Sequence, residues 1–275
     1  MMTIVTDQEL AESARADQTG RCWWCGGIAD SREHKHKRSA LRRMQDGGGM
    51  YLGVDGQAPY RVRGPNSPAV KFKKILCRKC NNVRSQPFDA AYDEYWKYVQ
   101  TNSPMLNRAT VVDWTAVYGD QWAEKTRALG RYAIKNFGCW MAESGFRPPE
   151  AFVTFLNGGE LADTRVVLAR KESISLMERA LRLDGTRARD AGMGVYGALG
   201  MVSRSRLQLT AWDQISYVSD ICMHITWRED AGVGDVFWRL PFAPLEVMPA
   251  SMSQKMLAVK IGARALIRRV QRSHR

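Results

Sequence analysis

The sequence predicts an α+β protein in two parts, and three observations support this fold class. Residues 1–105 hold two Cys-x-x-Cys pairs, with short runs of strand length next to helical patterns. Residues 106–275 begin with long segments whose apolar residues recur at helical spacing. Later segments of that part alternate apolar and polar residues, as half-buried strands do. We therefore expect an N-terminal domain and a separate α+β C-terminal domain, with helices first and antiparallel strands after them.

The composition favours a polyanionic partner. The 275 residues include 41 Lys and Arg against 28 Asp and Glu, which gives a net charge of +13. Nine Trp and 45% hydrophobic residues are enough for a packed core. We expect no secretory signal and no transmembrane helix, since neither apolar pattern occurs. Cys139 and Cys222 are expected to be free thiols in a reducing cytoplasm, with a disulfide between them as the alternative.

The elements of the N-terminal part follow from its local patterns. They are a helix at residues 8–16, a strand at 28–34, a basic helix at 37–45, an irregular Gly- and Pro-rich insert at 46–69, a strand at 70–76 and a helix from Asn81 onward.

The C-terminal part changes from helical to strand patterns along its length. The expected elements are helices at 121–144, at about 148–159 and at 171–183, strands at 195–202, 206–212, 221–228 and 236–240, and a basic amphipathic helix at 255–275. A basic amphipathic helix can bind nucleic acid, a membrane surface or a partner protein, and the charge of the whole chain favours nucleic acid.

The two Cys-x-x-Cys pairs predict a four-thiolate zinc site made by Cys22, Cys25, Cys77 and Cys80. A simple zinc ribbon holds roughly 15–20 residues between its pairs, and this chain holds far more. The intervening segment contains an acidic residue followed at once by a histidine, in a basic run. We therefore look for reactive chemistry between the pairs.

Three residues of this segment have the chemistry that phosphodiester hydrolysis needs. A neutral imidazole can accept the proton of an attacking water, which assigns His34 as the candidate base. Glu33 and Asn81 offer the oxygen atoms that Mg²⁺ or Mn²⁺ prefers. Neighbouring residues on a regular strand point to opposite faces, so His36 is the alternative base or ligand.

On these residues the stretch resembles the HNH endonuclease family, the zinc-containing ββα-metal nucleases. The resemblance covers about residues 20–100 and implies a ββα unit stapled by the four-cysteine site. It implies His34 as general base, Glu33 and Asn81 as ligands of a catalytic ion, and structural Zn²⁺. The chain departs from the family in having Glu33 where Asp is usual, and in lacking a nearby proline and a middle Asn within residues 70–76.

The resemblance implies a metal-dependent endonuclease acting on DNA, most simply double-stranded, in the cytoplasm of a bacterial or phage-infected cell, with a role in defence. Basic residues near the site are expected to contact the nucleic acid. They are Arg32, Lys35, Lys37, Arg38, Arg42 and Arg84. The alternatives are a non-catalytic, zinc-binding regulatory protein and a structural protein stapled by zinc. The C-terminal domain would serve target recognition, a homo-oligomer or a protein partner.

Overall fold

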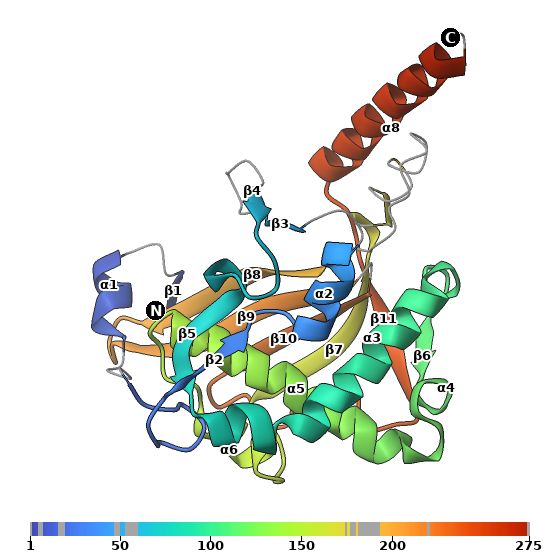
Figure 1. Ribbon diagram of the computed structural model, residues 1–275. Coiled ribbons are helices and arrows are strands. Elements are labelled where there is room, and N and C mark those ends of the chain that lie inside the picture. The colour runs from blue at the N-terminus through green and yellow to red at the C-terminus, as the bar shows by residue number, and fades with distance from the viewer. Residues whose placement is uncertain are drawn as a thin grey trace.

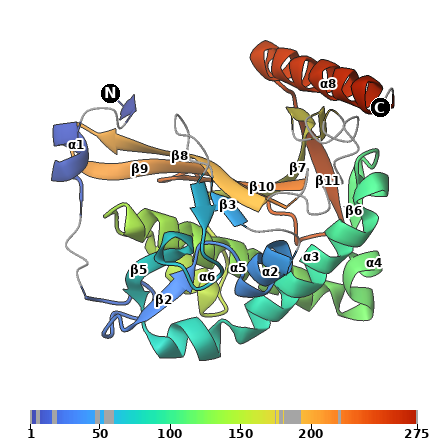
Figure 2. The same ribbon diagram turned by 45° about the horizontal axis from the view of Figure 1, so that its top comes forward.

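The computed structural model describes residues 2–4, 8–15, 20–46, 50–52, 60–173, 175–176, 180, 193–218 and 221–273. Helices and β-sheets are both present, which confirms the α+β class. Figure 2 shows α3, α5 and α6 on one face of a large sheet, with α8 apart from these helices.

The large sheet has seven strands among the described residues, in the order β1-β8-β9-β10-β7-β11-β6. They are β1 (Met2–Ile4), β6 (Val111–Asp113), β7 (Thr164–Lys171), β8 (Met193–Ser203), β9 (Gln208–Val218), β10 (Ile221–Arg228) and β11 (Phe242–Met248). All neighbours pair antiparallel except β7 and β11, which are parallel. The expected antiparallel arrangement is thus mixed at one position.

The sheet also joins the N-terminal strand β1 to strands of the C-terminal part. Strand β1 pairs with β8, so that Met2 lies opposite Ser203. One hydrophobic cluster contains buried residues from the cysteine segment, such as Trp23, and from the late strands, such as Leu245. Helix α3 (Gln86–Leu106) runs across the expected division of the chain. The boundary at residue 105 stays a prediction.

Five further helices match predicted helices with shifts at their ends, namely α1 (Gln8–Ser13), α2 (Arg38–Asp46), α5 (Trp122–Glu143), α6 (Glu150–Leu156) and α8 (Met252–Ser273). Helix α4 (Trp114–Tyr118) and the 3₁₀ turns η1 (Pro68–Val70) and η3 (Gly119–Gln121) were not predicted, and the π-helix η2 (Lys79–Arg84) begins the helical segment predicted from Asn81. Helix α5 packs between α3, α6 and β5, and it is buried along most of its length. None of the described helices is long and apolar enough to cross a membrane.

The N-terminal segment contains a second, two-stranded antiparallel sheet of β2 (Ser31–His34) and β5 (Lys71–Leu76). The segment expected to be irregular contains a further short hairpin, β3 (Met50–Leu52) with β4 (Tyr60–Val62). Strands of three residues are too short to show a period in the sequence, which explains the difference. Figure 1 shows β2 and β5 beside α5.

One predicted strand of the C-terminal part was wrong, and the strands β6, β7 and β11 were not predicted. The strand expected at 236–240 is absent, and Val236 makes only an isolated bridge with Val166. A strand lies instead a few residues later, at β11 (Phe242–Met248). It was not predicted because it includes Pro244, and a proline argues against strand structure on sequence alone. Strand β7 was missed because its apolar residues do not alternate regularly. The helix expected at 171–183 lies largely outside the described residues.

Candidate metal centre and adjoining polar network

Four cysteine thiols come together where the segment after α1 meets the end of β5. The sulfur atoms of Cys22, Cys25, Cys77 and Cys80 all lie within 4.8 Å of one another. The Sγ atoms of Cys25 and Cys77 are 3.6 Å apart. In a tetrahedral site with Zn–S bonds of about 2.3 Å, the sulfur atoms lie roughly 3.8 Å apart. The four thiols therefore have the ligand type and spacing that a metal ion such as zinc requires.

Tight backbone turns bring each pair of thiols together. The amide of Gly26 donates to the carbonyl of Cys22 at 2.8 Å, and the amide of Cys22 donates to the carbonyl of Gly27 at 2.7 Å. Gly26 has a φ of +75°, a conformation that favours glycine. At the other pair, the amide of Cys80 donates to the Sγ of Cys77 at 3.4 Å. Such N–H···S bonds stabilise negative charge on a metal-bound sulfur.

Arg84 lies directly beside the thiols. Its guanidinium carbon is 4.4 Å from the centre of the Trp24 ring, and its Nη1 is 3.6 Å from the Sγ of Cys80. Its other terminal nitrogen donates to the side chain of Asn157, which also accepts a hydrogen bond from Trp24. Arg84, predicted to contact nucleic acid, is thus held against the cysteine group, where its charge offsets that of thiolates.

Glu33 and His34 diverge on strand β2. The pairing of β2 with β5 is irregular, with register shifts on both sides of Arg32. Glu33 is buried and contacts Lys135 of α5, whereas His34 contacts the carbonyl of Pro65 in the segment before β5. The two side chains thus point in different directions, as strand geometry predicts for neighbours.

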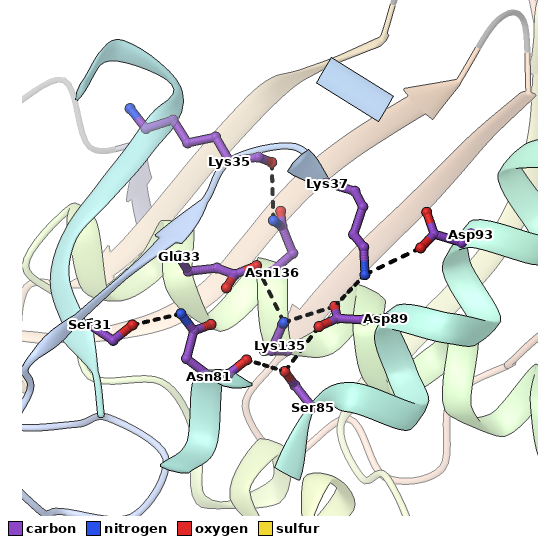
Figure 3. A network of polar contacts seen from close by, with 10 residues as sticks. All are labelled: Ser31, Glu33, Lys35, Lys37, Asn81, Ser85, Asp89, Asp93, Lys135 and Asn136. Atoms are coloured by element: carbon purple, nitrogen blue, oxygen red, sulfur yellow. Dashed lines mark hydrogen bonds and ion pairs between the residues drawn. The ribbon is translucent and has the colours of Figure 1, made fainter. Parts of the chain in front are cut away.

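A completely buried lysine joins two carboxylates below β2. The Nζ of Lys135 lies 3.3 Å from Glu33 Oε1 and 3.3 Å from Asp89 Oδ1 (Figure 3). Burial raises the pKa of Glu33, and the positive charge of Lys135 opposes that rise. Burial also disfavours the charged form of Lys135, but Glu33 and Asp89 outweigh it and raise the pKa of the lysine. Lys135 therefore carries its charge inside the protein.

Lys37 extends this network toward the surface. Its Nζ lies 3.5 Å from Asp89 Oδ1 and 3.6 Å from Asp93 Oδ2, and Asp93 also accepts a hydrogen bond from Ser39 at 2.6 Å. Positive and negative groups thus alternate from the core outward, from Glu33 to Asp93 (Figure 3). Lys37, predicted to contact nucleic acid, is occupied by these two aspartates.

Asn81 lies in the π-helix η2, between the cysteine group and the lysine network. Its amide nitrogen donates to Ser31 Oγ at 2.8 Å, while its backbone carbonyl accepts a hydrogen bond from Ser85 at 2.5 Å. Its amide oxygen is buried and has no hydrogen-bond donor among the described residues. A buried acceptor without a donor is uncommon and calls for an explanation such as an ion.

The ring of His34 is half-buried and held by a backbone carbonyl. Its Nε2 lies 3.0 Å from the carbonyl oxygen of Pro65. Burial is the main cause that lowers the pKa of His34, and the nearby charges of Lys71 and Arg38 lower it further. The ring is therefore neutral at pH 7. Because a carbonyl only accepts hydrogen bonds, Nε2 carries the proton and Nδ1 has the free lone pair.

His36 lies elsewhere. It lines a small cavity beneath the large sheet, together with Tyr92, Tyr132 and Gln214. Burial lowers the pKa of His36 to about 4, and the neighbouring charge of Lys35 contributes. The alternative base thus lies in a cavity formed with α3, α5 and the sheet.

The remaining basic residues near the site differ in their exposure to solvent and in their pairing with acidic or aromatic side chains. Arg32, Arg38 and Arg42 are exposed. Lys35 is paired with Glu143, with an N–O distance of 3.9 Å, and lies over the ring of Trp140. The exposed arginines are the ones placed to reach a large polyanion.

Sequence reasoning missed Lys135, Asp89 and Pro65. Lys135 falls within the buried stretch of α5, where a lysine among apolar neighbours is a sequence signal of a buried charge with a partner. Asp89 lies near the beginning of α3, where an acidic residue is also explained by the helix dipole. Pro65 contributes only its backbone carbonyl, for which the sequence contains no signal.

Comparisons with models of protein families, with curated proteins and with solved structures found no match.

Proposed function

We propose that this protein is a metal-dependent DNA endonuclease of the HNH type, with His34 as its general base. The observation that carries the proposal is the state of His34. Its ring is fixed by the Pro65 carbonyl, burial lowers its pKa and so favours the neutral form, and it is carried on the strand that pairs with β5, the strand before Cys77. A general base needs this protonation state and a fixed orientation.

In this proposal His34 takes a proton from water through Nδ1. The Nε2–H remains bound to the carbonyl of Pro65, which keeps the ring orientation fixed while Nδ1 becomes protonated. The activated water then attacks the phosphorus atom, and the bond to the leaving oxygen breaks. The exposed Arg32 and Arg38 flank this residue in sequence and are suited to contact the phosphate backbone.

A catalytic Mg²⁺ or Mn²⁺ would be held by Glu33 and Asn81. Because the side chains of Glu33 and His34 contact different elements, the proposal requires β2 to bend so that the ion and His34 reach one phosphate. The donor set fits a hard cation, because Asn81 offers a buried oxygen that accepts from no donor in the described part of the chain, and Glu33 offers a carboxylate. When bound, such an ion neutralises charge on the phosphate and on the leaving oxygen. Lys135 now contacts the Glu33 carboxylate, so the ion and this lysine compete for the same oxygen.

Zinc has a structural role in this proposal. The four thiols tie the loop after α1 to the end of β5 and the beginning of η2, and they thereby fix the strand pair that carries His34. The net charge of +13 favours double-stranded DNA as the partner. Residues 106–275 would supply target recognition, a homo-oligomer contact or a protein partner, in the cytoplasm of a bacterial or phage-infected cell.

Cleavage of supercoiled plasmid with Mg²⁺ or Mn²⁺ tests the proposal. Wild type should cut, EDTA should stop cutting, and His34→Ala should lower the rate by about 10²-fold or more while DNA binding persists. His224→Ala is the matched control, because this half-buried histidine lies on the large sheet and is held by Asp213 at 2.8 Å. Equal cutting by His34→Ala and wild type would refute His34 as the base.

A second candidate is a non-catalytic, zinc-binding nucleic-acid-binding protein with a regulatory role. The contact between Lys135 and Glu33 favours it, because a carboxylate paired with a buried ammonium is a poor metal ligand. This candidate predicts salt-sensitive DNA binding without cleavage at any divalent ion concentration. It also predicts that His34→Ala changes DNA binding little.

A further inference from the structure

The strongest unexplained feature is the set of oxygen atoms around Lys135. Its side chain has no solvent exposure, and its ammonium group contacts carboxylates from two elements, Glu33 of β2 and Asp89 of α3 (Figure 3). Both contacts are 3.3 Å long. A hydrophobic side chain in the same position of α5 would avoid the cost of burying these charges. The presence of a lysine at this buried position therefore needs an explanation, and the carboxylate oxygens that it contacts provide one.

Asn81 adds a second, independent observation. The residue is 93% buried, and its amide oxygen has no donor among the described residues. Its amide nitrogen is fixed on Ser31, which turns the oxygen away from that serine. Figure 3 shows this oxygen on the side of Asn81 that faces Glu33 and Lys135. Glu33 of β2 and Asp89 of α3 contact the Lys135 ammonium group, and the oxygen of Asn81 in η2 faces the same region without being bonded to that ammonium group.

We infer that Glu33, Asp89 and Asn81 form a binding site for a hard divalent cation, and that Lys135 occupies this site with its own ammonium group. A divalent ion enters only by displacing Lys135. The ligand class is Mg²⁺ or Mn²⁺, since two carboxylates and an amide oxygen suit these ions. The inference rests on the proposed function only in assigning a catalytic role to the bound ion.

Charge explains why one cation must be present. Without Lys135, the buried carboxylate of Glu33 and the partly exposed carboxylate of Asp89 would lie close together, and Lys37 is the remaining described cation paired with Asp89, on its outer side. An uncompensated buried carboxylate such as that of Glu33 is costly, and a bound divalent ion would offset that cost. Asp89, which nothing in the sequence pattern assigned to a metal, becomes the third ligand.

The test is Mn²⁺ binding to the zinc-loaded protein without DNA, measured by the EPR signal of free Mn²⁺. Lys135→Met should bind one Mn²⁺ per chain at least about tenfold more tightly than wild type. Lys37→Met is the matched control, because it removes the same charge from Asp89 but leaves Lys135 on Glu33. Its affinity should stay within roughly threefold of wild type.

A second substitution locates the site. Adding Glu33→Gln to Lys135→Met should return Mn²⁺ affinity to that of wild type. The inference is overturned if folded Lys135→Met binds Mn²⁺ no more tightly than wild type, or if tight binding survives Glu33→Gln. If Lys135→Met is unfolded as purified, refolding in millimolar Mn²⁺ is the measurement. Recovery that requires Mn²⁺ supports the site, and failure to recover overturns it.

The two proposals fail separately. A protein that binds Mn²⁺ as expected but cuts no plasmid refutes the nuclease and leaves the cation site. A protein that cuts plasmid through His34, yet shows no gain in Mn²⁺ affinity with Lys135→Met, refutes the role of Lys135 and leaves the nuclease.

Discussion

The cysteine group and the Lys135 network lie close together in the fold, but their negative charges are balanced by cations from different sources. The four thiols are gathered from two local motifs and need an external cation to balance thiolate charge. The carboxylates of Glu33 and Asp89 are gathered from distant elements and are balanced by a cation that the chain itself provides. The charge balance of the cysteine group therefore depends on the supply of metal. A metal ion can reach Glu33 and Asp89 only if the Lys135 side chain moves away.

Helix α5 connects the two regions. Lys135 extends from it to Glu33, and one turn later Gly138 lies against the Trp23 ring of the cysteine segment. A side-chain carbon at Gly138 would come within 2.6 Å of that ring. Both regions thus contact the same helix.

Loss of the zinc ligands should have the largest effect. Structural zinc sites contribute on the order of 10 kcal/mol in small domains, so Cys77→Ser should abolish stoichiometric zinc and destabilise the fold by more than about 5 kcal/mol. Elemental analysis and thermal unfolding measure both quantities. Cys222→Ser, a buried thiol of β10 outside the group, is the control and should keep its zinc.

Removal of the buried lysine should come next. Lys135→Ala leaves two carboxylates without their buried partner and should cost about 3–5 kcal/mol in the free energy of unfolding. Lys125→Ala breaks a partly exposed pair with Glu94, in which the N–O distance is 2.8 Å, and should cost under about 1 kcal/mol. Denaturant unfolding compares them, and equal costs would contradict the network described for Lys135.

Acid should weaken the fold through His36. Its pKa is about 4 in the folded protein, against an ordinary value near 6.5. Between these values the unfolded chain binds the proton and the folded chain does not, so stability falls as pH falls from 6.5 to 4. The full effect is about 3 kcal/mol. His36→Gln should flatten this pH dependence, measured by urea unfolding, and an unchanged slope would assign it to other groups.

The smallest expected effect concerns the contact between α5 and the cysteine segment. Gly138→Ala should cost about 1–3 kcal/mol, because the added carbon overlaps the Trp23 ring and that ring is packed in the core. Gly27→Ala meets only the Cys25 sulfur at 3.5 Å, an ordinary contact, and should change stability by less than about 1 kcal/mol. Thermal unfolding of both variants tests whether the contact is tight.

The cysteine group and the α+β class could be predicted from the sequence because both depend on local spacing. Cys-x-x-Cys needs only one turn, and the alternation in residues 221–228 matched strand β10. The Lys135 network could not be predicted in the same way. Glu33 and Lys135 are separated by 102 positions, and their contact follows from how α5 packs on β2.

For the candidate site, the sequence did not determine whether the side chains of Glu33 and His34 point to the same side of their strand. Neighbouring residues on a regular strand point to opposite faces, so Glu33 and His34 were expected to diverge unless the backbone bent there. The strand pair is irregular at this point, yet the two side chains still contact different elements. The carbonyl of Pro65, which orients His34, carries no side-chain signal at all.

Strand β1 has a consequence for how the chain is made. Met2 pairs with Ser203, so β1 can pair only after about two hundred further residues have been made. The four cysteines lie between Cys22 and Cys80, so they can come together before β8 exists. During synthesis the cysteine group can therefore form while β1 still lacks its partner strand.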